Sequence, residues 1–216
     1  TVITDNTGVT YDLMQDSPTQ NWATLNPLRP GNFPQFGNGT PGVISDANLA
    51  FTGTGGDAQL SSNVINTIAT DQSFYFEAVC NTKGPNNNSF FAMPQDGTTA
   101  NAAQPGNELT WGSNGNLSQR GGTGSATGTT WGAGDVIRIR WDAVNNIMGQ
   151  AVNNGAWTTF TAPNTYDDPL SIGLTSFASD SYAINFGQKP WVHGIPDGFE
   201  AIQTQNLPEA PIANGR

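Results

Sequence analysis

The side chains that most often carry out covalent and acid–base catalysis are scarce in this sequence. There is one histidine, His193, and one cysteine, Cys80, in 216 residues. Any Ser-His-Asp or Cys-His arrangement would have to use His193, and no Gly-x-Ser-x-Gly motif is present to supply a serine nucleophile. One histidine and one cysteine cannot form a four-ligand zinc site. We therefore expect His193 to lie in a loop and Cys80 to be a structural residue in the core.

Acidic residues are more frequent, but their spacing matches no catalytic or metal-binding motif. The four glutamates are Glu77, Glu108, Glu200 and Glu209, and no Glu-x-Asp-x-x-Glu cluster occurs. Glycoside hydrolysis needs two carboxyl groups about 5–10 Å apart, so a hydrolase acting through Glu77 and Glu108 is an alternative that the sequence leaves open. Asp96 and the pair Asp167-Asp168 could contact calcium, yet no Asp-x-Asp-x-Asp loop is present. We predict no catalytic residue, no bound metal and no cofactor.

Phosphate, nucleic-acid and membrane binding are also disfavoured. The Gly-rich stretch RGGTGSATG (120–128) has neither Gly-x-Gly-x-x-Gly nor a Gly-Lys-Ser/Thr ending, so we expect a plain loop there. The formal net charge is −10, and seven scattered Lys and Arg residues are a poor match for nucleic acid or an anionic membrane surface. No apolar run reaches the length of about 18 residues that a membrane span needs, and no signal-peptide pattern opens the chain.

The elements that position these residues are predicted to be short β-strands. The 26 glycines and 14 prolines interrupt the chain at short intervals, and β-branched and aromatic runs lie between them. The pattern predicts about ten to twelve strands in two antiparallel sheets, because no helix-length segment separates them. The clearest expected strands are 48–53, 58–66, 73–80, 90–94, 108–112, 135–144, 147–152, 169–177 and 181–187. Residues 117–134 are expected to form a Gly/Thr/Ser-rich loop.

Two segments show the alternation of half-buried strands most clearly. In SFYFEAVC (73–80), Phe74, Phe76, Ala78 and Cys80 fall on one face. In DVIRIRWDAV (135–144), apolar residues likewise alternate with polar ones. Asn145-Asn146 is predicted to be the turn that joins this strand to 147–152, because asparagine tolerates positive φ.

The two ends of the chain are predicted to be accessory segments. Residues 1–42 are expected to form an arm that packs on the core through its apolar members, Tyr11, Leu13, Met14, Trp22, Leu25 and Leu28. Residues 192–216 are expected to cover the sheet and then leave as an extended connector, since Pro208 and Pro211 disfavour helix. Pro190 ends strand pairing because it has no N–H, and Trp191, Ile195 and Phe199 are then free to cover an edge.

The order of landmarks between residues 43 and 191 resembles that of SPRY domains. The matching pieces are FYFEAV (74–79), GDVIRIRWDAVNN (134–146), NNG (153–155) and NFG (185–187). The resemblance implies an all-β fold, a two-layer antiparallel β-sandwich of the concanavalin-like jelly-roll type, in which Glu77 is a structural carboxylate. The sequence departs from the family where Gly149 and Ala151 replace the bulky residues expected in the second hairpin strand.

The flanks, 11–28 and 185–212, resemble those of SPRY domains in large structural proteins of tailed bacteriophages. The most specific piece comprises Gly198, Phe199, Thr204, Asn206, Leu207 and Pro208. This resemblance implies a virion protein, assembled in the host cytoplasm and exposed on the particle surface.

Members of the family recognise partners through loops at one end of the sandwich. On that basis the candidate partner-binding residues are Asn86, Asn87, Asn88, Phe90, Trp111, Asn114, Arg120 and Trp131, although each of the aromatic residues could instead belong to the core. The resemblance implies a non-enzymatic module for virion assembly (appendage, fibre or decoration) or host-surface attachment, which could act as a homo-oligomer within a larger assembly. Its partners would be other virion proteins, or a protein or glycan of the host surface. The alternative is a lectin-like carbohydrate-binding module.

Overall fold

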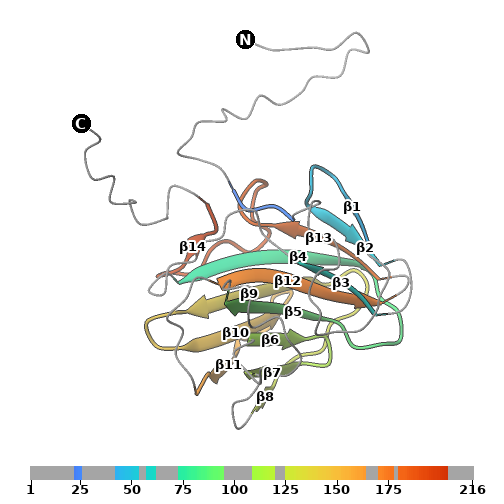
Figure 1. The fold of residues 1–216 in the computed structure, drawn as a ribbon. Coiled ribbons are helices and arrows are strands. Elements are labelled where there is room, and N and C mark those ends of the chain that lie inside the picture. Colours follow the sequence, from blue (N-terminus) through green and yellow to red (C-terminus); the bar gives the residue numbers. More distant parts are fainter. Residues whose placement is uncertain are drawn as a thin grey trace, which may run out of the picture.

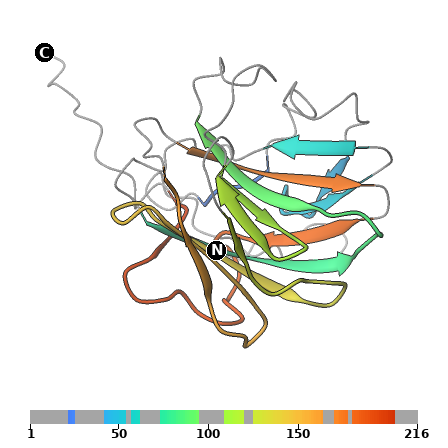
Figure 2. The same ribbon diagram turned by 90° about the horizontal axis from the view of Figure 1, so that it is seen from below.

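The computed structural model describes residues 22–25, 42–53, 57–61, 73–94, 109–119, 125–163, 170–177 and 180–203. All regular structure in these ranges is β, with fourteen strands in two sheets. None of the described residues belongs to a helix that could cross a membrane. Figures 1 and 2 show the two sheets stacked face to face.

The first sheet has the strand order β1-β2-β13-β4-β9-β10-β11, and β14 pairs with β4 in parallel. Its strands are β1 (Val43–Ser45), β2 (Ala50–Thr52), β4 (Phe74–Thr82), β9 (Val136–Asp142), β10 (Ile147–Val152), β11 (Thr158–Thr161), β13 (Ser181–Asn185) and β14 (Glu200–Ala201). The second sheet has the order β3-β12-β5-β6-β7-β8. Its strands are β3 (Asp57–Ser61), β5 (Ser89–Pro94), β6 (Leu109–Gly112), β7 (Asn116–Gln119), β8 (Ser125–Thr127) and β12 (Leu170–Phe177). All pairings except β14 with β4 are antiparallel.

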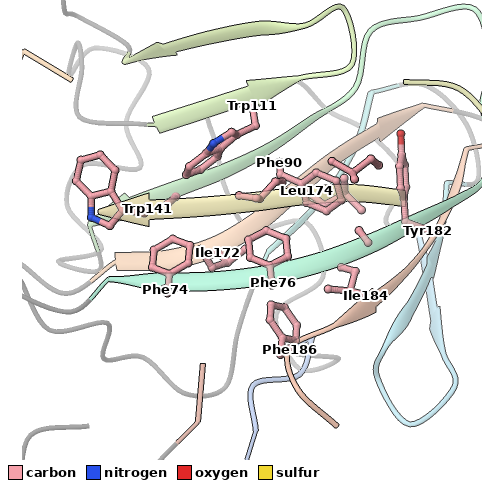
Figure 3. Packing of buried hydrophobic residues seen from close by; sticks show 14 of the residues in the cluster. Phe74, Phe76, Phe90, Trp111, Trp141, Ile172, Leu174, Tyr182, Ile184 and Phe186 are labelled. Carbon is pink, nitrogen blue, oxygen red and sulfur yellow. The ribbon is translucent and has the colours of Figure 1, made fainter. Parts of the chain in front are cut away.

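The core lies between the sheets and is rich in aromatic residues, as the alternation in strand 73–80 predicts. Phe76 of β4 packs edge to face on Phe90 of β5, with ring centroids 5.6 Å apart, and Phe90 contacts Tyr182 of β13 at 5.5 Å. Figure 3 shows these side chains between the layers, together with Phe74, Trp111 and Trp141. Cys80 is fully buried here, in the structural position expected for it.

Two local expectations were wrong. Residues 117–134 are not a continuous loop, because β7 and β8 extend the second sheet through this segment. These strands are only four and three residues long and rich in Ser and Thr, so their composition resembles that of a loop. The turn after β9 spans 143–146 rather than two residues, since Asp142 Oδ1 accepts the N–H of Asn145 over 3.0 Å and ends the strand early. Asn146 has the positive φ expected of it, 53°.

Both accessory segments contact the sandwich where they are described. Ala23 and Leu25 are buried, and the N–H of Ala23 donates to Ile202 O over 2.9 Å. Residues 191–193 and Phe199 contact side chains on the outer face of the first sheet, where Trp191 packs on Tyr75. Tyr11, Leu13, Met14, Leu28 and the connector from residue 204 lie outside the described residues, and the division at residues 42 and 191 stays a prediction.

Candidate binding surface at the loop end

The loops at one end of the sandwich are joined by a buried polar cluster of Asn88, Ser113, Trp131 and Tyr182, which we call the hub. Asn88 ends the loop after β4, Ser113 lies in the β6–β7 turn, Trp131 precedes β9, and Tyr182 lies in β13. All four are buried. The hub therefore brings together segments that are far apart in the chain.

The hydrogen bonds of the hub run through Ser113 and Tyr182. The backbone N–H of Asn88 donates to Ser113 Oγ (2.9 Å), and the N–H of Ser113 donates to Asn88 O (2.7 Å). The N–H of Trp131 donates to Ser113 O (3.2 Å). Tyr182 Oη accepts both Asn88 Nδ2 (2.8 Å) and Trp131 Nε1 (3.3 Å). Among the side-chain polar atoms of the hub, Asn88 Oδ1 alone is buried without a hydrogen-bond partner in the described part of the chain. The bonds between the other polar groups of the hub restrict loop motion.

Further bonds close the loops around the hub. Lys83 Nζ donates to Gly84 O (3.1 Å) and to Asn86 O, so this lysine holds the curve of its own loop. The N–H of Gly84 donates to Asp180 Oδ1, which ties the loop to the segment before β13. Gln150 Nε2 donates to Thr129 O (2.8 Å). The surface above the hub is thus fixed by its own hydrogen bonds.

Three predicted site residues lie on this surface. Asn86, Asn87 and Asn114 are exposed, and Asn114 Oδ1 accepts the N–H of Asn116 over 3.1 Å. Their loops are adjacent because Asn88 and Ser113 are hydrogen-bonded to each other. The two loops to which the sequence analysis assigned these residues are therefore adjacent in the structure.

Four other predicted residues are buried beneath this surface. Asn88, Phe90, Trp111 and Trp131 are between 0% and 4% exposed, so they pack and position the loops and cannot offer their side chains to a partner. Trp111 Nε1 donates to Gly149 O (3.1 Å), a bond from the second sheet to the first. Arg120 lies outside the described residues.

The buried carboxylate of Glu77 is used for structural hydrogen bonds. Glu77 is 2% exposed and accepts the hydroxyl of Tyr75 (2.7 Å) and the N–H groups of Val192 (2.8 Å) and His193 (2.9 Å). His193 lies in the segment 191–199, which has no helix or strand, in agreement with the predicted loop position. Within the described ranges no three His, Cys, Asp or Glu side chains form a metal-binding group. Glu108, Asp96, Asp167 and Asp168 fall outside those ranges.

A pocket of about 480 Å³ lies at the end of the sandwich opposite these loops. It was not predicted from the sequence. Trp22 and Leu49 are among its lining residues, and so are Lys189 and Asp46, which form an exposed ion pair (2.8 Å). Two of its lining residues, Asp46 and Ala47, belong to a run of three left-handed residues that ends at Asn48. Such a run of non-glycine residues has no sequence signal beyond Asn48, so the pocket could not have been foreseen.

The sequence matches no protein-family model and no curated protein. Solved structures are similar to it. The SPRY domain of human HERC1 superposes with a TM-score of 0.50 at 14% identity, over 69% of this chain and 94% of that domain. The TRIM65 PSpry domain gives a TM-score of 0.52 at 9% identity, over 76% and 93%. A further human SPRY domain gives 0.46 at 14% identity, over 69% and 97%. The first two similarities, with the two antiparallel sheets, confirm the predicted β-sandwich fold.

Proposed function

We propose that this chain is a non-enzymatic protein-binding module that contacts its partner through Asn86, Asn87 and Asn114 at the loop end. The observation that carries the proposal is the hub, which fixes three loops from beneath while leaving these amides exposed. Binding to a preorganised surface costs less conformational entropy than binding to free loops. The similarity to SPRY folds is consistent with such a role.

We further propose that the module belongs to the virion of a tailed bacteriophage, in an appendage, fibre or decoration protein on the particle surface. It would mediate assembly with other virion proteins or attachment to the host surface. Support for this setting comes from the resemblance of the flanks 11–28 and 185–212 to those of phage structural proteins. The net charge of −10 suits partners other than nucleic acid.

The non-enzymatic part of the proposal is supported by how the reactive groups are used. Glu77 holds the segment 191–193, and burial raises the pKa of the Cys80 thiol, which disfavours the nucleophilic thiolate. The carbohydrate-binding alternative was based on a surface rich in Trp and Asn, whose rings would stack on sugars and whose amides would bond hydroxyls. Trp111 and Trp131 are buried at the loop end, so only the asparagine amides remain to support it.

Affinity capture with a matched loop variant tests the proposal. The chain and the triple variant Asn86→Ala, Asn87→Ala, Asn114→Ala are immobilised and exposed to disrupted phage virions and to host-envelope fractions. Bound proteins are quantified by mass spectrometry. We expect a virion or envelope protein that is retained by the unaltered chain and lost with the triple variant.

The control is Lys189→Gln, which changes an exposed residue at the opposite end of the sandwich. It should retain the same protein as the unaltered chain. Recovery of no protein from either fraction, or equal recovery with the triple variant, would count against the proposed surface. A glycan-array signal without protein capture would favour the lectin-like alternative.

A further inference from the structure

Two arginines lie side by side on the outer face of the first sheet, whereas the three loop asparagines lie in the turns after β4 and β6. Arg138 and Arg140 are separated by one residue on β9, so their side chains point to the same face. Both are half-buried. The chain has 17 Asp and Glu residues but only seven Lys and Arg residues. Because carboxylates are in excess, we would expect each of two adjacent arginines to form an ion pair.

Neither arginine has an ion pair with any residue that the structure describes. Arg138 donates through Nη2 to Gly155 O, and its Nε is buried without a hydrogen-bond partner. The contacts of the Arg140 guanidinium in the described part of the chain are with aromatic rings. Both guanidinium groups therefore keep N–H donors that no described residue uses, although Arg138 Nε itself is buried.

Two carboxylates that neighbour the arginines in the sheet, Glu77 and Asp142, are occupied by other bonds. Glu77 lies directly opposite Arg138 in the β4–β9 register, but its oxygens accept from Tyr75, Val192 and His193. Asp142 lies two residues after Arg140, and its two oxygens accept the backbone and side-chain N–H groups of Asn145, at 3.0 and 2.8 Å. Among the described residues, neither arginine is paired with these two carboxylates.

Aromatic rings hold the Arg140 guanidinium in place. Its Cζ lies 4.3 Å from the ring centre of Trp157 and 5.0 Å from that of Phe199, and Arg138 Cζ lies 5.0 Å from the Trp157 ring. A guanidinium held by ring contacts can still use its N–H edge for a carboxylate, and a fixed fork loses little freedom on binding. Gly149 makes room for this arrangement, because a Cβ there would meet Arg140 Nε at 2.6 Å.

We propose that Arg138 and Arg140 bind the carboxylate of an Asp or Glu side chain in an acidic segment of a partner protein. A carboxylate matches the two-donor fork of an arginine, and a single negative charge is repelled less than a phosphate by a chain of net charge −10. A protein carboxylate is favoured over an acidic sugar because Trp157 already stacks on both guanidinium groups. This inference rests on the proposed function only in taking the partner to be a protein.

Fluorescence anisotropy with synthetic peptides tests the site. The probe is a fluorescein-labelled peptide of four Gly-Glu repeats, and the comparison peptide has four Gly-Gln repeats. At low ionic strength we expect the Glu peptide to bind at least about tenfold more tightly, because charge-assisted bonds exceed neutral ones. Added NaCl should weaken the binding of the Glu peptide.

Three variants assign the binding to this site, and each is first checked for native folding by circular dichroism. Arg140→Gln removes the charge, Arg140→Lys keeps the charge but removes the fork, and Gly149→Ala displaces the Arg140 stem without changing any charge. We expect each to weaken binding of the Glu peptide by about five- to tenfold. Lys189→Gln removes the same charge from an exposed residue outside the arginine pair and should leave the affinity unchanged within about twofold.

The proposal is overturned if the Glu and Gln peptides bind equally or not at all. It is also overturned if Lys189→Gln weakens binding as much as Arg140→Gln, because the effect would then be one of net charge. If Arg140→Gln fails to fold, Arg140→Lys and Gly149→Ala decide the question, since both keep the charge. Tighter binding of an oligogalacturonate than of the Glu peptide would replace the protein carboxylate with an acidic glycan. None of these outcomes bears on capture through Asn86, Asn87 and Asn114.

Discussion

The carboxylate of Glu77 accepts the backbone N–H of His193 over 2.9 Å, a bond between residues 116 positions apart. Because the same carboxylate also accepts the N–H of Val192 and the hydroxyl of Tyr75, one buried side chain attaches the segment 191–193 to β4. Trp191 then packs on Tyr75 with ring centroids 5.3 Å apart. This bond gives the C-terminal cover a fixed position on the sheet.

Replacement of Glu77 by glutamine should loosen that cover. The variant Glu77→Gln keeps one acceptor oxygen but loses the charge, and it brings an amide that must find its own partner. We expect a loss of about 1–3 kcal/mol in the free energy of unfolding, measured by urea denaturation. Asp197→Asn neutralises an exposed carboxylate in the same segment and should cost less than about 0.5 kcal/mol. Equal losses in the two variants would contradict the anchoring role.

Stability should fall at high pH because of two buried tyrosines. Burial raises the pKa of both Tyr75 and Tyr182, and Glu77 raises that of Tyr75 further. The unfolded chain releases these protons near pH 10 while the folded chain keeps them, so raising the pH favours unfolding. We expect the free energy of unfolding, measured in urea between pH 8 and 11, to decline above about pH 9.5, by up to about 1.4 kcal/mol per pH unit for each tyrosine. A flat profile would show that neither phenol keeps its proton in the folded state.

Removing the Tyr182 hydroxyl should destabilise the loop end. In Tyr182→Phe, the donors Asn88 Nδ2 and Trp131 Nε1 both lose their acceptor inside the core. We expect a loss of about 1–3 kcal/mol and faster amide hydrogen exchange in residues 83–88 and 128–132. Exchange in β9 and β10 is the internal control and should change less. Unchanged hydrogen exchange in the loops would show that the hub does not order them.

Two glycines allow backbone strain to be distinguished from steric conflict. Gly187 has a φ of 126°, and a Cβ there would lie 2.6 Å from Trp22 Nε1. Gly194 has a φ of 75° with open space around it. We expect Gly194→Ala to cost about 1–2 kcal/mol and Gly187→Ala about 2–4 kcal/mol, with increased exchange at 22–25 in the latter alone. Similar losses of stability and similar hydrogen exchange in the two variants would mean that the Trp22 side chain moves aside without a large energetic cost.

The thiol of Cys80 should be unreactive in the folded protein. It is fully buried, and burial raises its pKa, so little reactive thiolate is present at neutral pH. We expect labelling by 5,5′-dithiobis(2-nitrobenzoic acid) to occur at the rate of unfolding, and to become immediate in denaturant. Rapid labelling of the native chain would contradict a purely structural role.

The strands with strict alternation were predictable from the sequence. β9 and β10 were identified because Ile137, Ile139 and Trp141 alternate with polar residues and an asparagine turn follows. β7 and β8 could not be identified in the same way, because they are only four and three residues long and each has a single apolar residue, Leu117 and Ala126. Such short segments form strands only when a neighbouring strand supplies the hydrogen bonds.

The binding surface was predictable only in part. Loop positions rich in asparagine identified Asn86, Asn87 and Asn114, but alternation cannot tell which face of a short strand is buried, so Phe90 and Trp111 were assigned to both alternatives. Asn88 is a polar residue in the core because Tyr182, 94 residues later, accepts its side chain. The stacking of Arg140 on Trp157 and Phe199 likewise depends on contacts across strands that no local pattern encodes.

Trp22 and Gln203 form an antiparallel β-bridge, so these two positions, 181 residues apart in the sequence, lie side by side. A short linker joining these two positions would permit circular permutation, with new ends opened in the exposed turn at Asn154. The same geometry favours insertion of the domain into a surface loop of another protein, because the two ends of that loop would need to move apart only slightly.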